Sequence, residues 1–436
     1  RLWRDHANPP ALVPAQAGTI RAQAIAGVVM AACIAAGHWI PWGQARDRAG
    51  WLVMVFVNAD SGGDPHEWII ARDLEDLDSA NHPEGVDVVV QASRCGWDAW
   101  DGGWKGTRRY RVAGPAGRDP GSFEAERLPD PPGPVDPSDG GALAGFVEWA
   151  AARYPADHRM LVIEAHGSGW RGLSPADMAE DPGDLMSIPD GELAAALARA
   201  AAAAPIDVVV LDACLMGMWE AGFALRGATR YALTSEEIGG PILGSWPDVL
   251  GMLGAGPADP RAACAAIPGM LDRERTRANS ATRTCVDLSG HEALTGAVDA
   301  LAAAALADDA SLAALGRALE GALRFTKPAH ADLGDLAARI AADPAAGQGM
   351  AAAARDLAAA LGGYVVHHES SPFVGKAASH GVCGPPGLRG SCARSTGVAI
   401  WAPAPPPPGL WPVYLEGPWS ATRWDEALAA LASSRR

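Results

Sequence analysis

The chain has 436 residues, enough to bury a large core in one elaborated α/β domain or in two domains. Hydrophobic residues make up 49% of it and charged residues 20%, which excludes an intrinsically disordered protein. The formal net charge of -16 argues against nucleic acid or an anionic membrane surface as the main partner, because both would repel the chain, whereas cationic substrates are compatible with it.

The first 50 residues are predicted to be an N-terminal segment, with a signal or leader as its candidate role. An uncharged apolar stretch runs from Ala24 to Ala36 and follows Arg21. It has the length of a signal-peptide core and is too short to cross a bilayer. A short hydrophobic helix docked on the domain explains the same pattern. We expect a secreted or cell-envelope protein without a stable membrane span, with a cytoplasmic location as the alternative.

Five nearly continuous apolar runs in the first half of the chain predict strands that are buried on both faces. Such strands are typical of a parallel sheet with helices on each side. Helical patterns alternate with them, which implies right-handed βαβ crossovers. The loop Leu128–Gly140 is expected to end by capping the helix that begins at Gly141. The predicted strands are 51–58, 86–92, 160–165, 206–212 and 231–235, and the predicted helices are 68–79, 141–153, 191–204 and 218–225.

The second half of the chain has a different composition. From residue 257 to Leu361 it is rich in alanine, with apolar residues at helical spacing. A loop-rich segment over 370–394 and a late strand over 397–403 follow. We therefore expect an α/β core over 51–256 and a helix-rich part over 257–436 that completes the fold.

Seven cysteines are too few for a disulfide-built scaffold, and their odd number leaves at least one unpaired if the others form bridges within the chain. Cys264 and Cys285 are interpreted as small core residues. Cys383 and Cys392 lie in a Gly/Pro-rich loop where a local disulfide can form. With His367, His368 and His380 they also offer zinc ligands, but the irregular spacing favours a loop disulfide or no bond.

Two of the predicted strands end in residues that can do chemistry. His166 follows the run LVIEA, and Cys214 follows the run DVVVLD by one residue. The carboxyl ends of neighbouring parallel strands meet at one crevice, so both residues can face the same cleft. A thiol beside an imidazole supplies a nucleophile and a proton carrier, which is the chemistry of amide or ester hydrolysis.

Neighbouring residues fit the same chemistry. The N–H groups of Gly167 and Cys214 can stabilise the oxyanion of a tetrahedral intermediate. Asp212 precedes Cys214 by two positions, which in a strand places both side chains on the same side. Its carboxylate can then hold a guanidinium or ammonium group of a substrate.

Each residue also has a plainer interpretation. Cys214 can be buried filler, His166 can hydrogen-bond a loop carbonyl, and Asp212 can cap the helix that follows Cys214. Residue types and spacing alone leave these alternatives open.

The motif His166-Gly167-Ser168-Gly169-Trp170, followed by Asp212-Ala213-Cys214-Leu215-Met216-Gly217, resembles the paired His-Gly and Asp-x-Cys signatures of clostripain-like peptidases, relatives of caspases and gingipains. The resemblance extends over about residues 51–432. Supporting matches lie at 51–56, 73–77, 149–155, 234–237, 245–247, 332–336, 397–403 and Trp424.

The resemblance implies a caspase-like three-layer α/β/α sandwich, with a mostly parallel sheet and an appended helical region. It implies a cysteine endopeptidase with a Cys214/His166 dyad that forms an acyl-enzyme. Protein or peptide substrates would be cut after Arg or Lys, selected by Asp212, with Ser235 and Glu236 helping to line the pocket. Family members commonly cut themselves at a basic residue after the His-Gly motif, but no Lys or Arg lies between Arg171 and Arg199 here.

The chemistry of such a dyad requires no cofactor. Calcium is nonetheless a candidate ligand. The resemblance to clostripain implies a calcium-dependent enzyme, and the loop after His166 is acidic. Its acidic residues are Asp177, Glu180, Asp181, Asp184, Asp190 and Glu192.

Two other functions compete with peptide hydrolysis. A non-catalytic binding module with the same fold would have no chemical reason to keep His166, Cys214 and Asp212 together. A serine hydrolase is disfavoured, because no Gly-x-Ser-x-Gly nucleophile elbow lies near either strand end.

Overall fold

The computed structural model describes residues 48–59, 66–94, 104–114, 125–174, 185–242, 244–256, 259–270, 282–370 and 392–434, with backbone only over 66–72. Residues 48–436 group into one compact unit. The apolar stretch Ala24–Ala36, His380, Cys383 and most of the acidic loop lie outside the described residues. Within the part of the chain that is described, no helix combines the length and apolar character needed to cross a bilayer.

One nine-stranded sheet forms the centre of this unit, in the order β13-β11-β10-β9-β5-β1-β2-β3-β4. The five central strands β1, β2, β5, β9 and β10 pair in parallel, and the four outer strands pair antiparallel. The central strands are β1 (Ala49–Ala59), β2 (Val86–Arg94), β5 (Ala156–Glu164), β9 (Ile206–Asp212) and β10 (Thr229–Thr234), and the outer ones are β3 (Gly106–Val112), β4 (Glu126–Leu128), β11 (Thr282–Asp287) and β13 (Val365–Ser370).

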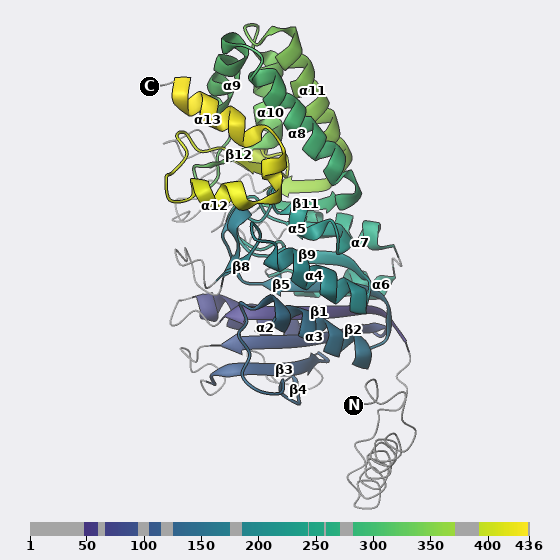
Figure 1. Ribbon diagram of the computed structural model, residues 1–436. Helices are drawn as coiled ribbons and strands as arrows, with labels where there is room; N and C mark the ends of the chain where they lie inside the picture. Colours follow the sequence, from purple (N-terminus) through teal and green to yellow (C-terminus); the bar gives the residue numbers. More distant parts are fainter. Residues whose placement is uncertain are drawn as a thin grey trace, which may run out of the picture. The chain divides into compact units, whose positions relative to one another are not determined.

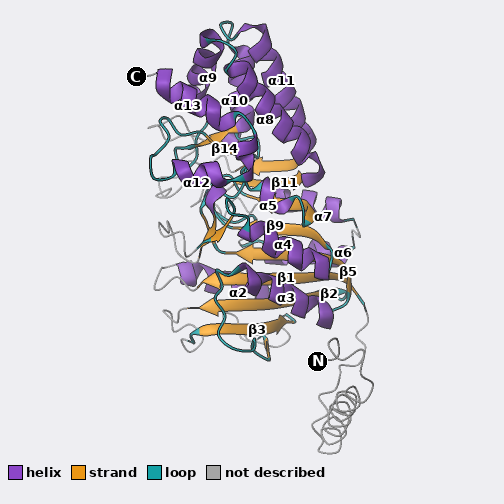
Figure 2. Ribbon diagram, viewed as in Figure 1, coloured by secondary structure: helices purple, strands orange, loops and turns teal. Residues whose placement is uncertain are grey.

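Helices cover both faces of this sheet (Figures 1 and 2), which confirms the predicted three-layer α/β/α fold. Leu143 and Leu197, from α3 (Gly140–Arg153) and α4 (Glu192–Ala203), belong to the core cluster on one face. Leu77 and Leu250, from α2 (His66–Ser79) and α6 (Trp246–Ala255), belong to the cluster on the other. The side chain of Asp139 accepts a hydrogen bond from the N–H of Gly141 at 2.7 Å, the helix cap that the loop composition predicted.

The helix predicted over 218–225 is shorter in the structure. Only α5 (Gly222–Leu225) is helical, because the residues before it join a strand-like pairing. Met218 bridges Ala399, and the N–H of Trp219 donates to the carbonyl of Ala399 at 2.8 Å. This extended pairing ties the chain beyond Cys214 to the predicted late strand, observed as β14 (Ala399–Trp401).

The alanine-rich part of the chain forms the packed helices seen at one end of the sheet in Figure 1. It is not continuously helical, because β11 and β12 (His330–Asp332) interrupt it. β11, together with β13 just after this part of the chain, extends the main sheet. Its helices are α7 (Pro260–Ala266), α8 (His291–Ala305), α9 (Asp309–Gly321), α10 (Leu333–Ala342) and α11 (Gly347–Tyr364), with α12 (Trp411–Glu416) and α13 (Trp424–Ser434) following β14. A small sheet of β6 (His166–Gly167), β7 (Gly172–Ser174) and β8 (Met186–Ser187) lies beyond the end of β5.

Cys264 and Cys285 are fully buried, which confirms their interpretation as core residues. What the sequence did not indicate is that they form a disulfide, which joins α7 to β11. Sequence spacing gave no sign of this pair, because the two residues meet only once β11 has returned to the sheet. Cys392 is disulfide-bonded as well.

Candidate active site

Two neighbouring strands bring the predicted motifs to one edge of the sheet. β5 and β9 pair in parallel, with Glu164 in register with Asp212. His166 lies two residues beyond the end of β5, and Cys214 lies two residues beyond the end of β9. Both side chains are half-buried, so each combines a fixed position with access to solvent.

Gly167 packs directly against the backbone of Cys214. A Cβ atom added at Gly167 would lie 1.8 Å from the carbonyl oxygen of Cys214 and 3.0 Å from its nitrogen, whereas ordinary contacts begin near 3.4 Å. Only glycine fits this approach. The residue beside His166 therefore contacts the main chain of the candidate nucleophile.

The turn that carries Cys214 is held by the segment after β10. Leu215 adopts a left-handed φ of 66°, which is uncommon for a residue with a side chain. Its N–H donates to the carbonyl of Glu237 at 3.2 Å, and the N–H of Gly217 donates to the carbonyl of Ser235 at 2.6 Å. The thiol of Cys214 is unbonded to another cysteine, and the N–H of Gly239 donates to its sulfur at 3.3 Å.

Asp212 lies under the same segment, although on the other face of the sheet. Its Oδ1 accepts a hydrogen bond from the N–H of Ile242 at 3.1 Å, and a Cβ at Gly240 would lie 1.8 Å from that oxygen. The side chain is 5% exposed. Residues 237–242, which we call the covering loop, thus contact both Asp212 and Cys214.

Two expectations about Asp212 were wrong. β9 ends at Asp212, so strand alternation does not extend to Cys214, whose side chain packs against the core cluster on the α3 and α4 face. Asp212 instead alternates with the residues that face α2 and α6. Asp212 does not cap the next helix either. That helix begins only at Gly222, and the Oδ1 of Asp212 accepts the N–H of Ile242 instead.

Ser235 and Glu236, predicted to line a substrate pocket, are both fully buried. The hydroxyl of Ser235 donates to the carbonyl of Glu237 at 2.9 Å. An Oε2 of Glu236 accepts the N–H of Gly397 at 3.0 Å, while burial and the neighbouring Asp332 raise the pKa of Glu236 well above its ordinary value. These side chains support the turn from beneath in this structure, and their predicted part in lining a substrate pocket stays a prediction.

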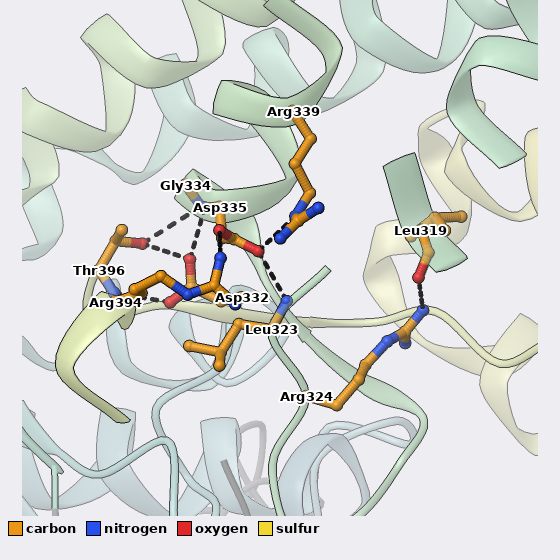
Figure 3. Close-up of polar contacts among 9 residues, drawn as sticks. All are labelled: Leu319, Leu323, Arg324, Asp332, Gly334, Asp335, Arg339, Arg394 and Thr396. Carbon is orange, nitrogen blue, oxygen red and sulfur yellow. Dashed lines mark hydrogen bonds and ion pairs between the residues drawn. The ribbon is translucent and has the colours of Figure 1, made fainter. Parts of the chain in front are cut away.

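Asp332 extends this support into the helical part. Its two carboxylate oxygens accept the N–H groups of Asp335 at 2.7 Å and of Thr396 at 2.6 Å, and the hydroxyl of Thr396 also donates to it (Figure 3). Arg339 and Arg394 in turn pair with Asp335. The position of residues 396–399 against the turn is therefore fixed by a polar network that spans α10 and the late strand.

Two further acidic residues, which the sequence reasoning did not single out as site residues, lie beside Asp212. Asp73 accepts the N–H of Gly244 at 3.0 Å and the indole N–H of Trp246 at 2.6 Å. Burial, followed by the charge of Asp212, raises the pKa of Asp73 to about 7. Glu164 is 4% exposed, and burial raises its pKa well above the ordinary value, with Asp73 and Asp212 adding to the effect. The signal in the sequence was an acid inside the apolar run LVIEA.

The described residues contain no group of three or more His, Cys, Asp or Glu side chains that could hold a metal ion. Of the acidic loop, Glu192 accepts the N–H groups of Gly140 and Ser187, which is a capping role. His367 contacts the carbonyl of Ala265 at 2.6 Å, and His368 contacts hydroxyls of Thr284 and Ser395. Calcium binding stays a prediction.

Comparison with known proteins agrees with this architecture. The sequence model of the clostripain family matches residues 133–323, which include β5, β9 and both motifs. No curated protein matches the chain.

Solved structures match over most of the chain at low identity. An inactive zymogen C11 protease from Parabacteroides distasonis is 15% identical, with a TM-score of 0.58, over 87% of this chain and 99% of that one. The secreted C11 cysteine protease iotapain from Bacteroides thetaiotaomicron is 14% identical, with a TM-score of 0.60, over 86% and 99%. A secreted C11 cysteine protease from Bacteroides thetaiotaomicron, solved in complex with an irreversible peptide inhibitor, is 16% identical, with a TM-score of 0.58. That match covers 87% of this chain and 99% of the other.

Together the fold and the family match relate this chain to caspase-like cysteine peptidases. Residues 133–323 match the clostripain family, which confirms the predicted resemblance.

Proposed function

We propose that this chain is a cysteine endopeptidase that cleaves peptide bonds after Arg or Lys, with Cys214 as nucleophile and His166 as acid/base. The observation that carries the proposal is the contact of Gly167 with the backbone of Cys214. It supports a geometry in which the adjacent imidazole and the thiol serve one reacting carbonyl.

The proposed reaction has two halves. His166 accepts the proton of the Cys214 thiol, the sulfur attacks the carbonyl carbon of the substrate, and His166 passes that proton to the leaving amine as the C–N bond breaks. Water then attacks the resulting thioester, with His166 accepting its proton, and the C–S bond breaks. The N–H groups of Gly167 and Cys214 are the proposed donors to the oxyanion in both halves.

Asp212 is the proposed partner of the positively charged P1 side chain. Its burial supports this role, because a charge-assisted hydrogen bond is stronger away from water. Gly240 and Ile242 occupy the space around its Oδ1 in this structure. The proposal therefore requires the covering loop to shift when a P1 side chain binds.

Export from the cytoplasm is also part of the proposal. The Cys264–Cys285 disulfide supports it, since such bonds persist mainly in oxidising compartments. The similar iotapain is described as secreted.

Labelling with an arginyl chloromethyl ketone tests the proposed function. Intact-mass and peptide analysis should find one inhibitor adduct, on Cys214, and the same run with and without added calcium addresses the predicted calcium dependence. An unlabelled protein that still binds arginyl peptides would instead indicate the non-catalytic binding module.

A substitution of Asp212 tests the predicted P1 preference. Asp212→Asn keeps the hydrogen bond from Ile242 but removes the charge. We expect the KM for an arginyl reporter to rise by about 10- to 100-fold, with a smaller change in kcat. Steady-state kinetics on arginyl and citrullyl reporters measure this effect, and an unchanged ratio between the two would contradict the role.

A further inference from the structure

Three carboxyl groups from three different elements lie near enough to one another to interact electrostatically, and one of them, Asp212, lies under the covering loop. Asp212 ends β9, Glu164 ends β5 in register with it, and Asp73 comes from α2. Paired residues on adjacent strands are about 5 Å apart at their backbones, so Glu164 and Asp212 are immediate neighbours. Val57 of β1 is the register partner of Glu164. Among the described residues, the N–H groups of Ile242, Gly244 and the Trp246 indole bond the two aspartates, and Asp76 of α2 adds a further negative charge beside Asp73.

Glu164 is the member of this cluster that protein contacts do not explain. Asp73 binds Gly244 and Trp246, and Asp212 binds Ile242, whereas no hydrogen bond to Glu164 occurs among the described residues. The groups that act electrostatically on Glu164 are two more carboxyls. A buried acid without a hydrogen bond or a cation is costly to keep, which suggests that its partner is a ligand.

We infer that Glu164 is a second carboxylate of the P1 site, and that it makes the site prefer a guanidinium over an ammonium group. This inference rests on the proposed function. A guanidinium is a planar fork with donors on two edges, so it can bridge Glu164 and Asp212 at the same time. An ammonium is a compact point charge that one carboxylate satisfies. Arginine is therefore the preferred P1 residue.

Binding of the cation is coupled to the loss of a proton. Burial and the two neighbouring acids favour the protonated form of Glu164 in the unoccupied site. A guanidinium reverses that balance, because it stabilises the carboxylate. Arginyl substrates should therefore bind more tightly as the pH rises from the ordinary carboxyl value of 4.5 toward the raised pKa of Glu164.

The isosteric variant Glu164→Gln tests this specificity. We expect the KM for an arginyl reporter to rise by about 10-fold while kcat stays unchanged, and the KM for a lysyl reporter to change by less than about 3-fold. The pH dependence of the arginyl KM should flatten. Asp157→Asn, at an exposed carboxyl of the same strand, is the matched control and should behave like the wild type. An unchanged ratio of arginyl to lysyl kcat/KM in Glu164→Gln would overturn the inference.

A second measurement does not depend on turnover. Adding agmatine to the full chain in weak buffer, over a pH series that starts just above 4.5, should release protons wherever the raised pKa keeps Glu164 protonated. An indicator dye detects the release, and 1-aminopentane should release fewer protons. The release should fall in Glu164→Gln. No release from the wild type with agmatine, or release with calcium alone, would overturn the inference. A wild type that cleaves no arginyl reporter would instead refute the proposed function.

Stability distinguishes a binding role from a structural one. The folded-state pKa of Glu164 lies above its ordinary value of 4.5, so the folded protein holds the extra proton. Stability is therefore lost as the pH rises from about 4.5 through the folded pKa. Glu164→Gln should raise the Tm at pH 8 and leave it unchanged at pH 5. A lower Tm at both pH values would mean that Glu164 stabilises the fold, and would overturn the inference.

Discussion

Cys214→Ala is expected to reduce kcat/KM for an arginyl reporter by about 10⁴-fold or more, leaving only the rate that binding alone provides. His166→Ala should cost nearly as much, because the thiol then has no group to move its proton. Stopped assays with enzyme at micromolar concentration can measure such residual rates. Full activity in Cys214→Ala would show that the nucleophile is another residue.

The double variant gives a sharper test of the dyad. Groups that act as one unit are strongly non-additive, so Cys214→Ala combined with His166→Ala should be no slower than either single variant. Cys214 is half-buried and its thiol bonds no other cysteine, so its loss should leave thermal unfolding nearly unchanged. If the loss of kcat/KM in the double variant equals the product of the two single losses, Cys214 and His166 have independent roles.

Gly167→Ala is expected to have the largest effect outside the dyad, because it alters backbone geometry without touching a reactive group. Its Cβ would lie 1.8 Å from the carbonyl oxygen of Cys214, so one of the two segments must move by more than 1 Å. A shift of that size misplaces the imidazole, the sulfur and both proposed oxyanion donors. We expect kcat/KM to fall by about 100-fold or more and the free energy of unfolding to fall by about 2 to 4 kcal/mol.

The matched control is Gly251→Ala. Gly251 is exposed in α6, and a Cβ there meets nothing within 4 Å. This substitution should keep full activity and raise the free energy of unfolding by about 0.5 to 1 kcal/mol, because alanine favours a helix. Reporter kinetics and chemical denaturation measure both variants. If Gly167→Ala reacts with the chloromethyl ketone at the wild-type rate, the contact with Cys214 does not determine the geometry of the site.

Some features of this protein could be predicted from local sequence. The central strands β1, β2, β5, β9 and β10 are buried on both faces, so each reads as a continuous apolar run. The outer strand β3, with the sequence GTRRYRV, is polar because it lies near the sheet edge, and it was missed for that reason. The positions of His166 and Cys214 just beyond two strands followed from the same runs.

Contacts between distant segments were decided only by the tertiary structure. Whether Glu236 reaches a pocket or supports a turn depends on residues 397–399, which come to it from about 160 positions away. The Cys264–Cys285 pair and the covering loop over Asp212 depend on such contacts too. Apolar periodicity indicates which faces of a strand are buried, so it was enough to predict the three-layer arrangement. It does not record which polar groups meet, and therefore the cluster of Asp73, Glu164 and Asp212 emerged only from the folded chain.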